Sequence, residues 1–133
     1  MALVNGYEQY RQQTVMTASP GDLVLMLYDG CIKNLKLARI YIEEKNSQDA
    51  NNVIIKAQAI ITELMKGLDF NYEISNQLYK LYEYINWDLI NANIHKDIGK
   101  INSCLELVED MRSTWDQAIK IFRSKTYSAS AGE

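Results

Sequence analysis

The sequence has few residues that interrupt a helix, with one proline and six glycines among 133 residues. A fold built from many strands needs frequent turns, and Gly and Pro supply most of them. Hydrophobic residues make up 47% of the chain and charged residues 23%, which suits amphipathic helices around one core. The composition therefore predicts an all-α chain of one domain.

Histidine and cysteine are equally scarce. The single histidine, His95, cannot supply the two Glu-x-x-His pairs of a di-iron bundle, and its Asn-Ile-His-Lys-Asp context favours a solvated position in a turn. The two cysteines, Cys31 and Cys104, lie beside apolar periodic positions, so we expect buried free thiols. No phosphate loop, Cys-x-x-Cys pair or nucleophile elbow is present. We therefore expect no enzyme, with no catalytic, cofactor-binding or metal-binding residue.

Neither sign of charge dominates the chain. The 14 basic and 17 acidic residues are interspersed and leave a net charge of −3. A protein that binds nucleic acid concentrates Lys and Arg on one face, and this chain does not. It also has no run of about 18 apolar residues and no signal peptide at its start. We expect a cytoplasmic protein that binds no nucleic acid and does not insert into membranes.

The clearest local signal is a helix start at Ser19. Ser19 is a good N-cap, Pro20 suits the first helical position, and the Asp22 carboxylate favours the positive end of the helix dipole. Six apolar residues follow at positions 23–28 and surround the helix, so more than one of its sides must be covered. Gly30 lies within this helix and indicates close approach of another segment.

Apolar residues recur at helical spacing in four segments, which we expect to be helices at about residues 20–44, 50–68, 73–94 and 97–122. Ser47 or Asp49 is expected to cap the second helix. Short connections fold each helix back onto the one before it, which favours an antiparallel up-down-up-down four-helix bundle over an extended coiled coil. The predicted organisation is an N-terminal arm packed on the bundle (1–18), the bundle itself (19–123) and a disordered tail (124–133).

Arg112 lies on the apolar seam of the fourth predicted helix. A guanidinium in that position needs an acidic or carbonyl partner. We expect a salt bridge to another helix in preference to a binding role.

Two helices carry more apolar surface than one seam requires. On the second helix Ile54, Ile61, Met65 and Leu68 form a stripe beside the main one, with Gln58 among them. This stripe is either a binding surface or part of the core, if the helical phase is off by one residue. On the third helix Tyr79, Trp87, Ile90 and Ile94 point away from the seam, which favours an interface.

Nine tyrosines support an interaction surface, because Tyr combines a large contact area with a polar tip. Tyr7 and Tyr10 lie three residues apart on the arm, where they can pack across an apolar groove and be displaced by a ligand. The alternative is a disordered N-terminal tail. The predicted partner-binding residues are Tyr7, Tyr10, Ile54, Gln58, Ile61, Met65, Leu68, Tyr79, Tyr82, Ile90 and Ile94.

An ordered set of motifs between about residues 5 and 120 resembles the flagellin-specific export chaperones, the FliS family. The N-terminal part consists of Tyr7, Tyr10, Val15-Met16-Thr17-Ala18-Ser19-Pro20, Leu23, Met26-Leu27-Tyr28-Asp29-Gly30, Ile32, Leu35 and Ala38. Further matches are Lys56-Ala57-Gln58, Ile60-Ile61, Glu63-Leu64, Leu81-Tyr82, Tyr84, Leu89, Ala92-Asn93, Arg112 and Thr114-Trp115.

The resemblance implies an antiparallel bundle that binds the C-terminal segment of newly made flagellin in the cytoplasm. It implies that the bound flagellin cannot polymerise prematurely and is delivered to the gate of the flagellar type III export apparatus. It also implies that the arm packs on the bundle and yields to flagellin, without any cofactor. The free protein is expected to be a monomer or a weak dimer.

Two other functions remain open from the residues alone. The extra apolar stripes suit a structural bundle that associates with itself. A phosphotransfer four-helix module is the other alternative, although its histidine belongs in the middle of an exposed helix face.

Overall fold

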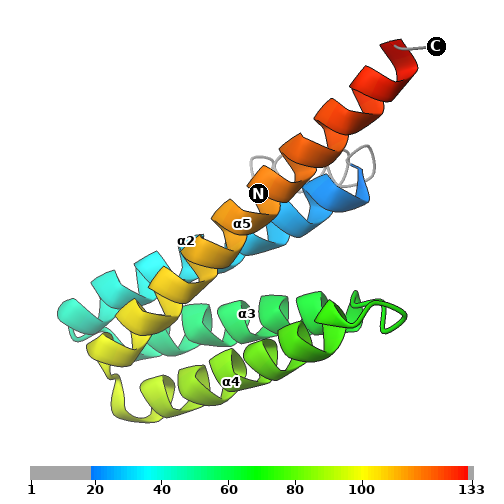
Figure 1. The fold of residues 1–133 in the computed structure, drawn as a ribbon. Helices are drawn as coiled ribbons and strands as arrows, with labels where there is room; N and C mark the ends of the chain where they lie inside the picture. Colours follow the sequence, from blue (N-terminus) through cyan, green and yellow to red (C-terminus); the bar gives the residue numbers. More distant parts are fainter. Residues whose placement is uncertain (1–18, 132–133) are drawn as a thin grey trace, which may run out of the picture.

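The structure, a computed structural model, describes residues 19–131, with side chains through residue 125. It contains four helices, α2 (Pro20–Glu43), α3 (Ser47–Lys66), α4 (Ile74–His95) and α5 (Ile98–Ala131). Each helix runs opposite to the one before it, so the described part of the chain is an up-down-up-down bundle (Figure 1). α2 packs against α3 and α5, and α4 packs against the same two helices. The predicted fold class is confirmed; the predicted arm lies outside the described residues.

The first helix begins where the sequence predicted. Ser19 is its N-cap, and the Ser19 hydroxyl accepts a hydrogen bond from the Asp22 backbone N–H at 3.2 Å. Pro20 occupies the first helical position, where its missing N–H leaves no hydrogen bond unmade. Close approach at Gly30 is also confirmed, because a Cβ there would lie 3.3 Å from the Ile60 side chain of α3.

The cap of α3 differs from the prediction. Asn46 is the N-cap, and its side-chain oxygen accepts from the Asp49 N–H at 3.2 Å while its amide donates to the Asp49 carboxylate at 2.7 Å. Ser47 is therefore the first helical residue and does not cap the helix. An asparagine caps a helix as well as a serine does. Because Asn46 is the cap, α3 begins at Ser47 and not at about residue 50.

Removing this cap provides a test. We expect Asn46→Ala to lower the free energy of unfolding by about 1 kcal/mol, because two hydrogen bonds at the start of α3 are lost. Ser47→Ala, one residue later on an exposed side chain, is the matched control and is expected to cost less than about 0.5 kcal/mol. Urea denaturation of both variants measures the difference. A larger loss for Ser47→Ala would restore Ser47 as the cap.

The last helix extends further than predicted. α5 continues to Ala131, through residues that the sequence analysis treated as a tail beginning at residue 124. No glycine or proline occurs between residues 100 and 131, so nothing in the covalent chain ends the helix earlier. In Figure 1 its C-terminal part projects beyond the other helices.

The core corrects the prediction for α3. Ile54 and Ile61, predicted on a possible binding surface, are completely buried. Ile60, which helical spacing places on the main core stripe beside them, is half-buried. The reason is that α3 lies between α2 and α4, so two adjacent faces of it are covered. The alternative in which these residues belong to the core is the one that the structure supports. Other fully buried large side chains are Leu35, Ile85, Leu89, Ile101 and Val108.

The bundle is not closed along its whole length. Figure 1 shows α2 and α5 diverging from α3 and α4 toward the end that carries the loop from 67 to 73. On α4 this changes burial along the helix, because Ile74 is exposed while Ile85 and Leu89 are fully buried. Helical periodicity predicts a core seam through Ile74, Ile85 and Leu89, and this prediction is correct in the middle of α4 and wrong at its start. The open end is where the candidate site lies.

Candidate partner-binding surface

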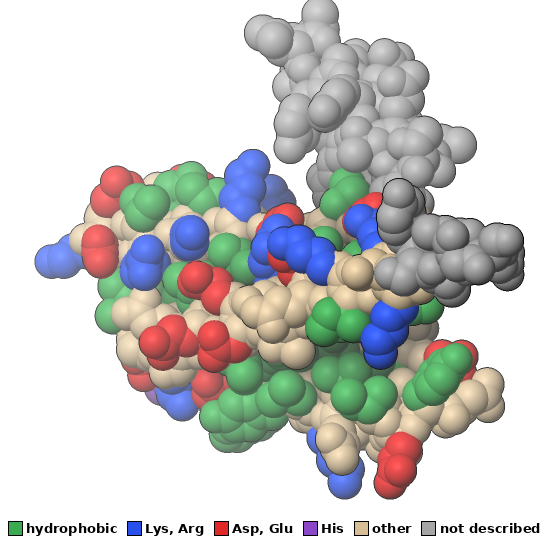
Figure 2. Space-filling model, turned by 45° about the horizontal axis from the view of Figure 1, so that its top comes forward, with side chains coloured by type: hydrophobic (Ala, Val, Ile, Leu, Met, Phe, Trp, Pro, Cys, Tyr) green, Lys and Arg blue, Asp and Glu red, His purple; other side chains and the backbone are tan. Residues whose placement is uncertain are grey.

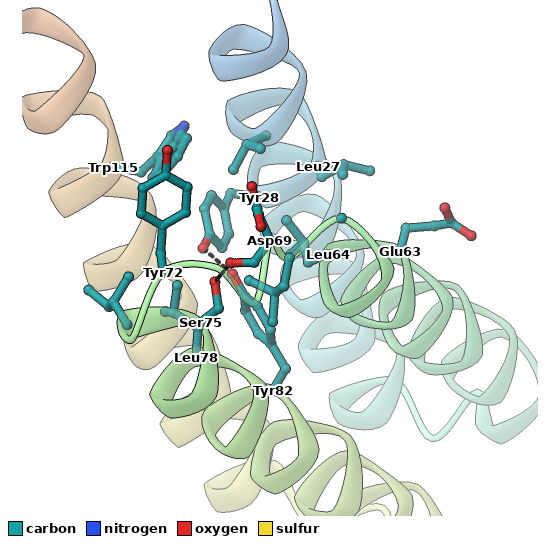
Figure 3. A pocket seen from close by; sticks show the side chains of 14 residues that line it. Leu27, Tyr28, Glu63, Leu64, Asp69, Tyr72, Ser75, Leu78, Tyr82 and Trp115 are labelled. Carbon is teal, nitrogen blue, oxygen red and sulfur yellow. Dashed lines mark hydrogen bonds between the residues drawn. The ribbon is translucent and has the colours of Figure 1, made fainter. Parts of the chain in front are cut away.

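An apolar cavity of about 390 Å³ lies at the open end of the bundle. We call it the end hollow. Its walls come from all four helices and from the loop between α3 and α4 (Figure 3). Its lining residues are Val24, Leu27, Tyr28, Glu63, Leu64, Gly67, Leu68, Asp69, Tyr72, Ile74, Ser75, Leu78, Tyr82 and Trp115.

Two buried tyrosines form the floor of the end hollow. The hydroxyl oxygens of Tyr28 and Tyr82 lie 2.5 Å apart and share a hydrogen bond. Burial is the main cause that raises the pKa of both phenols, so both are neutral under ordinary conditions. Above them the Ser75 hydroxyl donates to the backbone carbonyl of Asp69 at 2.6 Å and holds the loop against α4.

A second apolar cavity, of about 520 Å³, lies between the start of α2 and the middle of α5. We call it the side hollow, and it is lined by Ser19, Pro20, Gly21, Trp115, Ala118, Ile119, Phe122 and Arg123. Trp115 lines both hollows, and its indole N–H donates to the Gly21 carbonyl at 3.0 Å. This hydrogen bond anchors the indole ring to α2, so the two hollows share a fixed apolar wall.

The outward face of α4 adds a third apolar surface. Tyr84, Trp87, Ile90 and Ile94 are exposed along it. In Figure 2 hydrophobic side chains gather in patches among charged ones on the side of the molecule that α3 and α4 occupy. Together with the two hollows, this face exceeds the scattered single apolar residues that a monomer normally exposes.

The residues predicted to bind a partner fall into four groups. Tyr79, Ile90 and Ile94 are exposed on α4, and Leu68 lines the end hollow. Gln58 and Met65 are half-buried on α3. Ile54, Ile61 and Tyr82 are buried, which corrects their placement on an open surface; Tyr82 meets the end hollow from its floor. Tyr7 and Tyr10 lie outside the described residues.

Sequence reasoning missed three contributors to the hollows. Helical periodicity places Trp115 on the same apolar seam as Arg112, yet it is half-buried between the two hollows. Val24 and Leu27 belong to the apolar run that surrounds α2, and they line the end hollow. That run did indicate that more than one side of the helix is covered. It could not indicate that one side faces a cavity.

The seam arginine behaves as expected. Arg112 Nε donates to Asp29 Oδ1 at 2.7 Å, and this ion pair joins α5 to α2. His95 is the last residue of α4 and is exposed, in agreement with its predicted position near the turn. In the described ranges, no group of three His, Cys, Asp or Glu side chains could hold a metal ion. No described helix is long and apolar enough to span a membrane.

Both thiols are buried and unpaired, as predicted. Burial raises the pKa of Cys31 and of Cys104 to about 12 in each case. The reactive form of a thiol is the thiolate, which is therefore scarce at both positions.

We accordingly expect neither cysteine to react with a disulfide reagent such as Ellman's reagent in the native protein at slightly alkaline pH. Two thiols should react once the chain is unfolded in denaturant. A native protein that releases the chromophore at the rate of a small free thiol would contradict the burial of these side chains.

Comparison with known proteins gives consistent matches. A family model described as flagellar protein FliS matches residues 3–121. The chain is 40% identical over 129 residues to the flagellar secretion chaperone FliS of Bacillus subtilis, with 97% of each chain covered. It is 32% identical to the protein of that name from Salmonella typhimurium, covering 88% of this chain and 92% of the relative. A crystal structure of a flagellar chaperone from bacteria shares the fold, with a TM-score of 0.71, 19% identity and 88% of this chain covered.

Proposed function

The chain belongs to the FliS family of flagellar secretion chaperones, and from this premise we propose that it binds the C-terminal segment of flagellin in the cytoplasm. Binding keeps flagellin from polymerising before export. The complex then brings flagellin to the gate of the flagellar type III export apparatus. The protein acts by binding and release, with no catalysis and no cofactor.

The observation that carries this proposal is the pair of apolar hollows joined at Trp115. An unfolded segment that buries its apolar side chains on a chaperone can fold as it binds and can cover a large surface. The two hollows together offer depth for such side chains from the α3–α4 loop across to the start of α2.

The proposed contacts on this chain come from four places. Leu68 contributes to the end hollow, and Tyr79, Ile90 and Ile94 extend the surface along α4. Met65 and Gln58 lie on the neighbouring part of α3. Tyr7 and Tyr10 are proposed to pack on the bundle in the free protein and to yield to flagellin.

Titration calorimetry with a peptide of the flagellin C-terminal segment tests the proposal. We expect a one-to-one complex with a negative heat-capacity change, because apolar surface is buried on binding. Mass measurement of the mixture checks the stoichiometry. Absence of both heat and a mass shift would refute the proposed function.

The arm is tested separately by replacing Tyr7 and Tyr10 with alanine. We expect the double variant to change the affinity for the flagellin peptide more than it changes the free energy of unfolding. Equal losses of affinity and stability would place these tyrosines in the core.

The exposed face of α4 also favours a second candidate, self-association of the bundle. Sedimentation at rising protein concentration, without flagellin, distinguishes the two functions. A dimer that forms readily and occludes the flagellin peptide would support self-association as the function of this face.

A further inference from the structure

Two buried tyrosines from non-neighbouring helices meet at the floor of the end hollow. Tyr28 on α2 is 3% exposed and Tyr82 on α4 is 2% exposed. Their hydroxyls form the hydrogen bond drawn in Figure 3, and side chains of α3 and α4 such as Leu64 and Leu78 line the same hollow. The floor is therefore polar, while most of the wall around it is apolar.

This hydrogen bond uses one of the two hydroxyl hydrogens. Each phenol carries a single O–H, so a bond between two phenols leaves one hydrogen to donate elsewhere. In the described part of the chain, neither hydroxyl has a second partner. Ser75, which also lines the hollow, donates to the Asp69 carbonyl instead. Burial keeps both phenols protonated, so the spare hydrogen is retained.

The spare hydrogen restricts what can fill the end hollow. The open cavity of about 390 Å³ is large enough to hold water, which can accept this hydrogen in the free protein. A bound segment displaces that water, and a buried O–H without an acceptor opposes binding. The segment that fits best therefore brings an oxygen atom to the floor.

The charge of the lining decides which oxygen is suitable. Asp69 lines the hollow, so a carboxylate entering it would meet a like charge and lose its water. The Glu63 carboxylate also lines the hollow and is paired with Lys66 at 3.6 Å, so neither side chain adds a free positive charge that would favour an anion. A neutral carbonyl oxygen meets neither penalty. Carbonyls inside a helix are already bonded, so the source is either a backbone carbonyl at a helix end or extended stretch, or the amide side chain of Asn or Gln.

We propose that the Tyr28–Tyr82 pair is a specificity element of the binding site, in which one phenol donates its free O–H to a neutral carbonyl oxygen of the bound segment. This inference rests on the proposed function, since it takes the segment to be the C-terminal part of flagellin. It predicts that a segment bound in the end hollow places one hydrogen-bond acceptor among its apolar side chains.

The test replaces both tyrosines, because a single remaining hydroxyl can still donate. Tyr28→Phe with Tyr82→Phe keeps both rings and removes both hydroxyls together, so the free energy of unfolding should change little. The affinity for the flagellin C-terminal peptide should fall roughly threefold to tenfold, because the acceptor loses its donor. Tyr41→Phe is the matched control, because this half-buried tyrosine near the far end of α2 lines neither hollow. The Tyr41→Phe variant should bind the flagellin peptide with unchanged affinity.

Calorimetry of the variants, with thermal unfolding measured alongside, gives distinct outcomes. Wild-type affinity in a stable double variant overturns the inference and leaves the proposed function standing. No binding by the wild-type protein overturns the proposed function and the inference with it. If the double variant unfolds, Tyr28→Phe and Tyr82→Phe are titrated singly. The hydroxyl that remains can still donate, so each should keep wild-type affinity, and a loss of more than tenfold in both overturns the inference.

A second series of peptides identifies the source of the oxygen. Each Asn and Gln of the peptide is replaced by Ala in turn, and each peptide is titrated into the wild type and the double variant. If the wild type and the double variant bind one of these peptides with equal affinity, the side chain replaced in that peptide is the acceptor. If the double variant binds all of them more weakly than the wild type does, the acceptor is a backbone carbonyl.

Discussion

Ile54→Ala is expected to lower the free energy of unfolding by about 2–4 kcal/mol, because it leaves a cavity in a closely packed core. Ile54 is completely buried, and its helix is covered by α2 on one side and α4 on the other. The surrounding helices can relax into the vacated space only in part. Chemical denaturation of the purified variant measures the loss.

The adjacent residue is a control of the same type on the same helix. Ile55 is 51% exposed, whereas Ile54 is 0% exposed, so Ile55→Ala should cost less than about 0.5 kcal/mol. A small effect at Ile54, accompanied by loss of flagellin binding, would return Ile54 to the binding surface where the sequence analysis first placed it.

The second large effect concerns binding. Leu68→Asp should weaken the affinity for the flagellin peptide on the order of a hundredfold, because it places a carboxylate in the end hollow beside Glu63 and Asp69. Leu68 is half-buried and lies just beyond the C-cap of α3, so in the free protein the new charge can remain hydrated. Stability should therefore change much less than affinity does. Parallel calorimetry and denaturation separate the two effects.

Ile40→Asp is the matched control for this variant. Ile40 is an exposed residue near the C-terminal end of α2, far along that helix from Val24 and Leu27, and it lines neither hollow. The same change of an aliphatic side chain to a carboxylate should leave binding unaltered there. If Leu68→Asp binds as tightly as the wild type, the flagellin segment does not enter the end hollow.

The sequence predicted well what depends on neighbouring residues. The Ser19 cap with Pro20 behind it is a local motif, and helix α2 begins there in the structure. The lack of glycine or proline between residues 100 and 131 is equally visible and favours a continuous helix. The predicted tail from residue 124 differs from the structure, because α5 runs on to Ala131. Composition was given more weight there than the lack of a helix-ending residue.

The site was predicted less completely than the fold. The apolar excess on α4 was read correctly at Ile90 and Ile94, because an exposed stripe follows from the seam on the opposite face. Trp115 was not found, since a tryptophan on an amphipathic seam looks like any other core residue. Its role depends on α2 and α5 diverging from the other two helices, which no local pattern encodes.

By itself, the sequence determined an all-α chain, the helix starts at Ser19 and near residues 74 and 98, and the resemblance to one chaperone family. These follow from turn-forming residues, capping and helical periodicity, which act over a few neighbouring positions. Only the tertiary structure decided that Ile54 and Ile61 of α3 are buried, that the bundle opens at one end, and that Tyr28 meets Tyr82 there. Periodicity gives the width of an apolar face, but which helices cover it depends on how all four pack together.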